Sequence, residues 1–171
     1  VDSHGGEAYR MGGTVNAIRK LASENDVKII AYIDGTSASA GFGLASIADE
    51  IIANPQARVG SVGVVVQLYN DSKYLEKMGV ERSFVYAGKN KIPFTEDGSF
   101  AEDFITDLQK SVDKTYKQFT NLIATNPKMT VDKVVETNAK VFDADEALSI
   151  GFVDKIMEIE DFEHYINTPS N

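Results

Sequence analysis

The spacing of apolar residues changes along the chain between the pattern of a β-strand and that of an amphipathic helix. The sequence therefore predicts strands that alternate with helices. Runs rich in β-branched and other apolar residues predict strands at residues 27–33, 50–53, 62–68 and 82–87. Helices are predicted between and before them at residues 14–23, 38–48 and 71–78. The run at 62–68 is almost wholly apolar, which is typical of a strand covered on both faces.

The second half of the sequence predicts mainly helices. Residues 100–124 carry apolar side chains at spacings of four and seven, the stripe of an amphipathic helix packed on a core. Thr130 is expected to cap a shorter helix, and residues 143–150 to form another that ends at Gly151. A last strand is expected at 152–156, followed by an acidic, peripheral tail. The chain therefore reads as one α/β domain over residues 1–171.

Composition excludes several classes of function. The 171 residues carry a net charge of −9, which argues against non-specific binding to nucleic acid. The sequence has no apolar run that could cross a bilayer and no signal peptide. Without cysteine and with only two histidines, thiol catalysis is excluded and a metal site is not expected. Since the chain starts at Val1, we interpret it as a fragment or processed product that lacks its first strand or strands.

Residues 34–43 (Asp-Gly-Thr-Ser-Ala-Ser-Ala-Gly-Phe-Gly) lie where a strand is expected to give way to a helix. Ser39 at the head of that helix can present its hydroxyl to a substrate, because small neighbours leave room. The helix N-terminus favours the negative charge that develops in acyl transfer, and the Ala40 N–H is a natural oxyanion donor. The alternative is that such a turn serves only packing or helix capping.

Residues 3–6 (Ser-His-Gly-Gly) form a second glycine-rich turn, which can bring another backbone N–H to a substrate or can be a simple connection. The glycine spacing does not match a dinucleotide-binding motif. A serine nucleophile needs a base, and His4, with Asp2 to orient it, is one candidate. His164 lies in the acidic tail. Lys91 is another candidate if its surroundings keep it uncharged, although it can equally be an ordinary loop lysine.

Several segments, in order along nearly the whole chain, resemble serine peptidase family 49, which contains signal peptide peptidase A and the head maturation proteases of tailed phages. Residues 2–6 are similar to the family's Asp/Asn-Ser-Pro-Gly-Gly turn, and residues 38–55 to its nucleophile helix and the strand behind it. Residues 59–64 resemble Gly-Ser-Ile-Gly-Val, and residues 87–91 resemble the segment that ends in the catalytic lysine. Residues 141–154 match the closing helix and strand.

This resemblance implies a Ser-Lys dyad with Ser39 as nucleophile and Lys91 as general base. It further implies that Ser61 orients the lysine, and that the oxyanion hole consists of the N–H of Ala40 and that of Gly5 or Gly6. It also implies a crotonase-like (Clp protease-like) fold of βαβ units, a ring-like homo-oligomer whose neighbouring subunits can complete the active site, a peptide substrate and no cofactor.

The sequence departs from the family pattern at three places. His4 stands where proline is usual, Ala40 where glycine is frequent, and residues 92–94 (Ile-Pro-Phe) lack the pattern common in signal peptide peptidases. The last of these departures, together with the long helix that follows it, favours a phage-type head protease in the cytoplasm of the host cell. A signal peptide peptidase, membrane-associated through segments absent from this sequence, is the first alternative. A non-proteolytic crotonase-like enzyme acting on acyl-thioesters and a scaffold without catalysis are the others.

Overall fold

The computed structural model describes residues 1–168, and the backbone forms two compact units. Unit 1 consists of Val1–Val64 together with the chain from Thr115 onward, and unit 2 consists of Val65–Lys114. The end of the predicted domain, residues 169–171, lies outside the described residues. Each unit is described by itself below.

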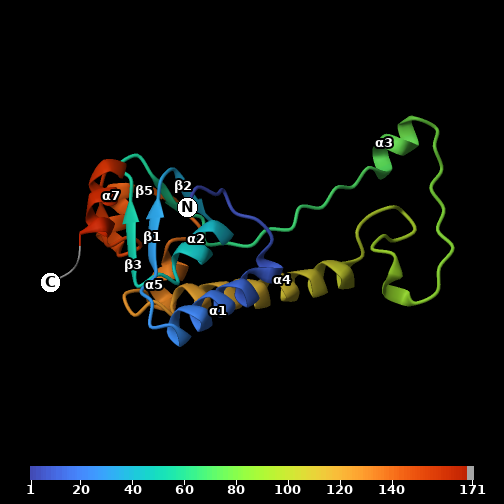
Figure 1. The fold of residues 1–171 in the computed structure, drawn as a ribbon. Helices are drawn as coiled ribbons and strands as arrows, with labels where there is room; N and C mark the ends of the chain where they lie inside the picture. Colours follow the sequence, from blue (N-terminus) through green and yellow to red (C-terminus); the bar gives the residue numbers. More distant parts are fainter. Residues whose placement is uncertain (169–171) are drawn as a thin grey trace. The chain divides into compact units, whose positions relative to one another are not determined.

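Unit 1 is built on two small sheets joined by short connections. In the first, β1 (Ile30–Ile33), β3 (Glu50–Ala53) and β6 (Lys155–Ile156) are all parallel, in the order β1-β3-β6. In the second, β2 (Thr36–Ala38) runs parallel to β4 (Arg58–Gly60), which pairs antiparallel with β5 (Val141–Asp143). The parallel pair β1 and β3, with helix α2 (Ala40–Ala45) between them in the chain, is a βαβ connection (Figure 1).

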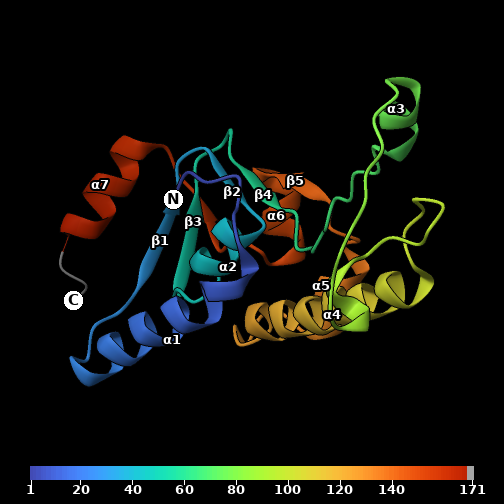
Figure 2. The ribbon, with the colours of Figure 1, turned by 90° about the vertical axis from the view of Figure 1, so that its right-hand side faces the viewer.

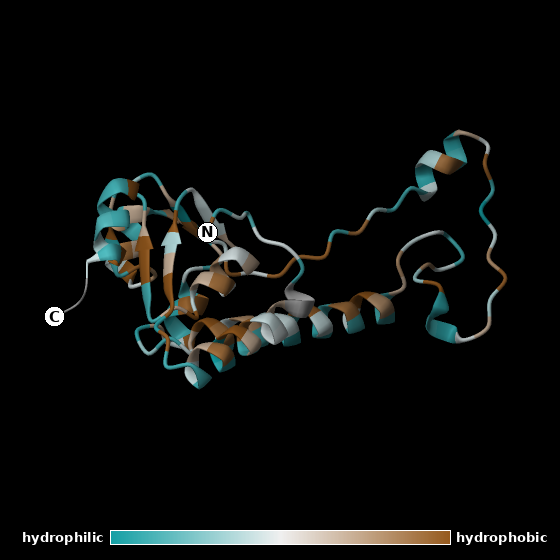
Figure 3. Cartoon of the chain, in the orientation of Figure 1, coloured by the Kyte–Doolittle hydropathy of each residue, from teal (hydrophilic) through white to brown (hydrophobic). Residues whose placement is uncertain are grey.

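Helices cover these sheets and close the core. Helix α2 packs on β1, β2 and α1 (Ala8–Glu24), while α6 (Ala144–Ile150) packs on β4, β5 and β6 (Figure 2). The buried Phe42 of α2 stacks on Phe152 with ring centroids 4.7 Å apart. The C-terminal part of α4 (Glu102–Ile123) adds the buried Phe119 and Ile123 to the same core. Strand β3, which is brown along most of its length in Figure 3, is buried throughout.

Two further helices complete unit 1. Helix α5 (Val131–Glu136) begins after Thr130, whose side chain accepts a hydrogen bond from the Lys133 N–H, as predicted. Helix α7 (Ile159–Asn167) follows β6, and its Phe162 stacks on Tyr32 of β1 with centroids 4.3 Å apart. The C-terminal segment is thus a surface helix with no buried residue, as expected for a peripheral tail, and it contacts β1 through the Phe162 ring.

The side chains of Lys28, Lys155 and Tyr165 surround the carboxylate of Glu50, which lies at the start of β3. The two lysine Nζ atoms lie 2.8 and 2.7 Å from its oxygens, and the Tyr165 hydroxyl donates to it at 2.9 Å. Burial of this carboxyl acts to raise its pKa, but the hydrogen bonds from Lys155, Lys28 and Tyr165 outweigh that effect and lower the pKa to about 2. Tyr165 belongs to α7, so this cluster helps to fasten the last helix to the sheet.

Unit 2 contains helix α3 (Ser72–Lys77), the short 3-10 turn η1 (Lys89–Lys91) and the first part of α4. Four phenylalanine rings stack in a row, with successive centroids 6.3, 5.0 and 6.1 Å apart, in the order Phe84, Phe94, Phe100 and Phe104. The backbone at residues 65–71 and 80–86, on the two sides of α3, forms neither a strand nor a helix.

The α/β class, the βαβ connection and the long amphipathic helix expected for a crotonase-like chain are confirmed. The strands predicted at 62–68 and 82–87 are wrong: these stretches pair with nothing in the described chain and are largely exposed from residue 65 on. The apolar stripe of α4 reaches the buried core only near its end, at Phe119 and Ile123.

In the part of the chain that is described, no helix is both long and apolar enough to cross a membrane.

Glu50→Gln should remove a pH-dependent part of the stability. Because the folded-state pKa of Glu50 lies below its ordinary value of 4.5, its contribution is complete above pH 4.5 and is lost as the pH falls toward 2. The shift corresponds to roughly 3 kcal/mol of unfolding free energy at neutral pH. Urea unfolding at pH 7 and at pH 3 should show a large loss for the variant at pH 7 and a small one at pH 3. The exposed Glu136→Gln is the control, and an equal loss at both pH values for Glu50→Gln would contradict the assignment.

Candidate active site

Ser39 joins β2 to α2 in a backbone conformation that side-chain-bearing residues rarely adopt. Its φ is 51° and its ψ is −127°, and its backbone N–H donates to the Gly60 carbonyl at 2.8 Å. A residue in so sparsely populated a region costs on the order of 1–3 kcal/mol and persists only where the surroundings enforce it. The Ser39 side chain is half-buried and makes no capping hydrogen bond to α2, so the helix-capping alternative is wrong. The hydroxyl is left for another use.

Gly5 packs directly against the Ser39 side chain. A Cβ atom added at Gly5 would lie 2.7 Å from the Ser39 Cβ and 3.2 Å from its Oγ, and the φ of Gly5 is +115°. Both constraints require glycine here, because any side chain would collide with the serine. The glycine-rich turn and the candidate nucleophile, separated by more than thirty residues in the sequence, therefore meet at one point in unit 1.

Hydrogen bonds hold the glycine-rich turn on β2. The Ser3 N–H donates to the Thr36 carbonyl at 2.6 Å, and the Ser3 carbonyl accepts from the Ala38 N–H at 3.0 Å. The Asp2 carboxylate accepts from the Thr36 N–H at 2.9 Å. Because Asp2 serves the β2 backbone, it is engaged away from the role of orienting His4.

The candidate oxyanion donors differ in how their N–H groups are used. Ala40 is the first residue of α2, where the N–H has no acceptor within the helix. The Gly5 N–H already donates to the Ser3 Oγ at 3.2 Å. A Cβ added at Gly6 would meet no atom within 4 Å, so this residue lies beside open space. Of the two glycines that the sequence left open, Gly5 therefore has an N–H that is already engaged within the turn.

Residues 138–140 contact Gly60 and Ser61 and so support the backbone of Ser39. The sequence did not predict this contact. Gly60, which accepts the Ser39 N–H, has a φ of +127°, and a Cβ there would lie 2.5 Å from the Lys140 carbonyl oxygen. The next residue, Ser61, has a φ of 53° and donates its N–H to the same Lys140 carbonyl at 2.9 Å. Asn138 and Ala139 also have positive φ values, of 48° and 57°. The sequence signals for this contact are Gly60 and Asn138, two residue types that favour positive φ.

A cavity of about 280 Å³ opens next to the candidate nucleophile within unit 1. Its lining includes Gly5, Gly6 and Ala40, whose chain neighbour is Ser39, together with apolar side chains of α1 and α2 such as Met11 and Leu44. Glycine is required at Gly41, since a Cβ there would lie 2.8 Å from the Ser3 carbonyl oxygen. The hollow is of a size to hold one small or medium apolar side chain.

The three candidate bases lie in different settings. His4 is exposed and immediately precedes Gly5, whereas His164 is exposed on α7. Lys91 belongs to unit 2, at the end of η1, where its N–H donates to the Gly88 carbonyl at 3.0 Å and its side chain is exposed. Unit 1 therefore brings together Gly5, Ser39 and Ala40, with Ser61 behind them. Among residues 1–168, no group of three or more acidic or histidine side chains could hold a metal ion.

Comparison with known proteins decides the family. The sequence model of peptidase family S49 matches residues 22–168. The chain belongs to peptidase family S49. This confirms the resemblance on which the expected site residues rest, and it covers both Ser39 and Lys91.

Three relatives of this S49 chain are similar over most of its length. Proteins named as the protease SohB of Haemophilus influenzae and the capsid assembly protease C of Escherichia phage lambda are each 29% identical over 162 residues. A protein named as the signal peptide peptidase SppA of Enterococcus faecium is 28% identical over 162 residues. Each match covers 94% of this chain but 45%, 36% and 47% of the relatives, in that order. The S49 chain thus spans less than half the length of these relatives.

Two solved structures are also similar to the S49 chain. One is a membrane-bound stomatin-specific protease in complex with a substrate peptide, with a TM-score of 0.46, 19% identity and coverage of 95% of this chain and 61% of that one. The other is an enoyl-CoA hydratase/isomerase from Marinobacter aquaeolei, with a TM-score of 0.46, 18% identity and coverage of 94% and 42%.

Gly5→Ala should lower peptidase activity at least 100-fold, because the new methyl group collides with the Ser39 side chain and the backbone cannot keep its φ of +115°. Gly12→Ala is the matched control, since a methyl group added there also meets no atom within 4 Å and Gly12 does not line the cavity; its activity should stay within about threefold of wild type. Cleavage of a fluorescent casein, alongside thermal unfolding, measures both. Equal activities for the two variants would contradict the contact between Gly5 and Ser39.

Proposed function

We propose that this chain carries the catalytic core of a serine endopeptidase with a Ser-Lys dyad, in which Ser39 is the nucleophile and Lys91 the general base. The observation that carries the proposal is the enforced backbone of Ser39 at the head of α2, with Gly5 packed against its hydroxyl-bearing side chain. Membership of family S49 supports the choice of Lys91, because residues 87–91 resemble the segment that ends in the family's catalytic lysine.

The reaction follows from these roles. Uncharged Lys91 takes the proton of the Ser39 hydroxyl as its oxygen forms a bond to the carbonyl carbon of the substrate, and the carbonyl π electrons move to the oxygen. The N–H groups of Ala40 and Gly6 stabilise this oxyanion, and each such donor is worth roughly 3 kcal/mol of the barrier. As the C–N bond breaks, the Lys91 ammonium gives its proton to the leaving amine.

Water completes the cycle on the acyl-enzyme. Lys91 takes a proton from the water, whose oxygen attacks the ester carbonyl, and returns it to the Ser39 oxygen as the ester bond breaks. We assign to Ser61 the role of orienting Lys91 through its hydroxyl. These steps need no cofactor, because every proton moves between protein side chains, substrate and water.

The substrate that we propose is an extended peptide with a small or apolar side chain next to the scissile bond. The cavity beside Ala40, about 280 Å³ and lined partly by Met11 and Leu44, supports this preference. As the finer function we propose the maturation protease of a phage head, supported by the similarity to the lambda capsid assembly protease. The similarity to SppA supports the second candidate, a signal peptide peptidase. Incubation with a phage scaffolding protein or with a synthetic signal peptide distinguishes these candidates by which one is cleaved.

Ser39→Ala and Lys91→Ala should each lower casein cleavage at least 1,000-fold while the thermal unfolding midpoint stays within a few degrees of wild type. Matched controls are the exposed Ser83→Ala and Lys89→Ala, which should retain activity. His4→Ala tests the Ser-His alternative. Activity that survives Lys91→Ala and is lost in His4→Ala would overturn the dyad.

Leu44→Ala should let the enzyme accept larger substrate side chains next to the scissile bond. Leu44 lines the cavity beside Ala40, and removing its isobutyl group makes room for a larger substrate side chain. The ratio of kcat/KM for leucine over alanine at that position, measured on paired peptides, should rise about tenfold. Leu148→Ala is the control, because this leucine of α6 is comparably exposed, at 40% against 39% for Leu44. An unchanged ratio would show that the cavity does not receive that side chain.

A further inference from the structure

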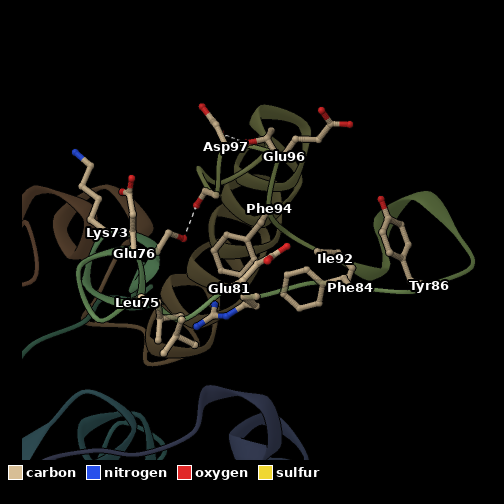
Figure 4. Close-up of a pocket in the computed structure, with 16 residues that line it drawn as sticks. Lys73, Leu75, Glu76, Glu81, Phe84, Tyr86, Ile92, Phe94, Glu96 and Asp97 are labelled. Carbon is tan, nitrogen blue, oxygen red and sulfur yellow. Dashed lines mark hydrogen bonds between the residues drawn. The ribbon is translucent and has the colours of Figure 1, made fainter.

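Ser3 is a further polar residue at the cavity beside the candidate nucleophile. It lines this hollow of about 280 Å³ together with Gly5, and its side chain is half-buried. The hollow shown in Figure 4 is larger, about 850 Å³, but its lining, which includes Leu75 and Phe94, belongs to unit 2, whereas Ser39 belongs to unit 1. The Ser3 hydroxyl therefore lies in the same unit and at the same cavity as the proposed chemistry.

The Ser3 hydroxyl holds the backbone of the glycine-rich turn. Its oxygen accepts a hydrogen bond from the Gly5 N–H at 3.2 Å, a local turn in which a serine side chain bonds the backbone two residues further on. Gly5 also packs on the nucleophile, since a Cβ added to it would lie 2.7 Å from the Ser39 Cβ. Gly5 is therefore held by the Ser3 hydroxyl and by the side chain of Ser39 at once.

Ser3 itself is fixed to the two elements that Ser39 joins. Its N–H donates to the Thr36 carbonyl at 2.6 Å, and its carbonyl accepts from the Ala38 N–H at 3.0 Å, so its backbone is paired with β2. Its side chain lies against the first turn of α2, because a Cβ added at Gly41 would lie 3.0 Å from the Ser3 Cβ and 3.1 Å from its Oγ. The hydroxyl thus has a defined position relative to the nucleophile.

The backbone of Gly5 decides the direction of the next N–H along the chain. The Gly6 N–H belongs to the rigid peptide plane that follows Gly5, so its direction depends on the backbone angles of Gly5. Glycine has access to many such angles, of which the observed φ of +115° is one. A hydrogen bond that restrains Gly5 therefore aligns the Gly6 N–H before a substrate arrives. Donors that are already in place stabilise an oxyanion without reorganisation at the moment of reaction.

We propose that Ser3 is a positioning residue of the peptidase reaction, whose hydroxyl holds the Gly5 N–H and thereby places the Gly6 N–H as an oxyanion donor. Ser3 acts through the turn and not on the substrate. This role rests on the proposed function, because it requires that Ser39 attack a carbonyl group beside the turn. It adds to that function the contact that assembles one half of the oxyanion hole.

Kinetics with a fluorogenic peptide that carries alanine next to the scissile bond test this role. Ser3→Ala should lower kcat about tenfold and leave KM within about twofold, because the peptide still binds but the N–H is no longer aligned. The loss is smaller than the roughly 100- to 1,000-fold loss on removal of an oxyanion donor, since the N–H itself remains. Ser3→Thr keeps the hydroxyl and should stay within about threefold of wild type.

Ser149→Ala is the matched control, because it also removes a serine hydroxyl that bonds the nearby backbone, here the Glu146 carbonyl at 2.7 Å on α6. Its kcat and KM should equal those of wild type. Thermal unfolding of all three variants checks that they are folded.

Two further measurements distinguish a positioning role from a merely structural one. When the Ser39 hydroxyl adds to the carbonyl of a peptide aldehyde, the hemiacetal oxygen occupies the oxyanion position. The Ki of such an aldehyde should therefore rise about tenfold in Ser3→Ala, in step with the fall in kcat/KM. Exchange of the Gly5 amide proton with water, followed by NMR, should become about tenfold faster in Ser3→Ala, because the proton loses its acceptor.

An unchanged kcat in Ser3→Ala, a loss carried by KM alone, or equal losses in Ser3→Ala and Ser3→Thr would overturn the role of Ser3 and leave the dyad untouched. Wild-type protein that does not cleave the peptide would contradict the peptidase function instead. The exchange rate of the Gly5 amide then decides for Ser3: a rate that Ser3→Ala leaves unchanged overturns its hold on the turn, and a faster rate supports it.

Discussion

The backbone strain at Ser39 is the constraint on which the candidate site depends. A serine with φ of 51° would relax to a more populated conformation if its neighbours allowed it. Two contacts prevent this: its N–H is held by the Gly60 carbonyl, and Gly5 packs against its side chain. Both neighbours are glycines with positive φ, so the tight approach is possible only with these residues. In this conformation the hydroxyl makes no capping hydrogen bond to α2.

The sequence could identify the residues of this site but not the conformation that joins them. Ser39, Gly5 and Ala40 were predicted from small-residue turns and from the family resemblance, and the structure brings them together. The support from residues 138–140 was missed, because it depends on a contact between segments about 80 residues apart. The assignments of Lys91 as base and of Ser61 as its orienting residue remain predictions that rest on the family.

In the fold as well, features set by nearby residues were predicted, and features that depend on contacts between distant segments were not. Helices α3, α4, α5 and α6 lie close to their predicted bounds, because capping residues and apolar periodicity are local signals. Strands β4 and β5 were missed, since each has only three residues and is defined by its partner. The stretches predicted as strands at 62–68 and 82–87 have the composition of strands but no partner in the described chain. A stretch of high β-propensity forms a strand only when it pairs with a neighbouring strand, and these stretches have no such neighbour among the described residues.

Mass-spectrometric mapping of the protein after reaction with a fluorophosphonate probe tests the central claim most directly. The probe forms a covalent bond only with a serine that is activated for nucleophilic attack. The account predicts one modified residue, Ser39, with labelling that falls at least 100-fold in Lys91→Ala and in Gly5→Ala. Labelling of a different serine, or undiminished labelling of Ser39 in both variants, would contradict it.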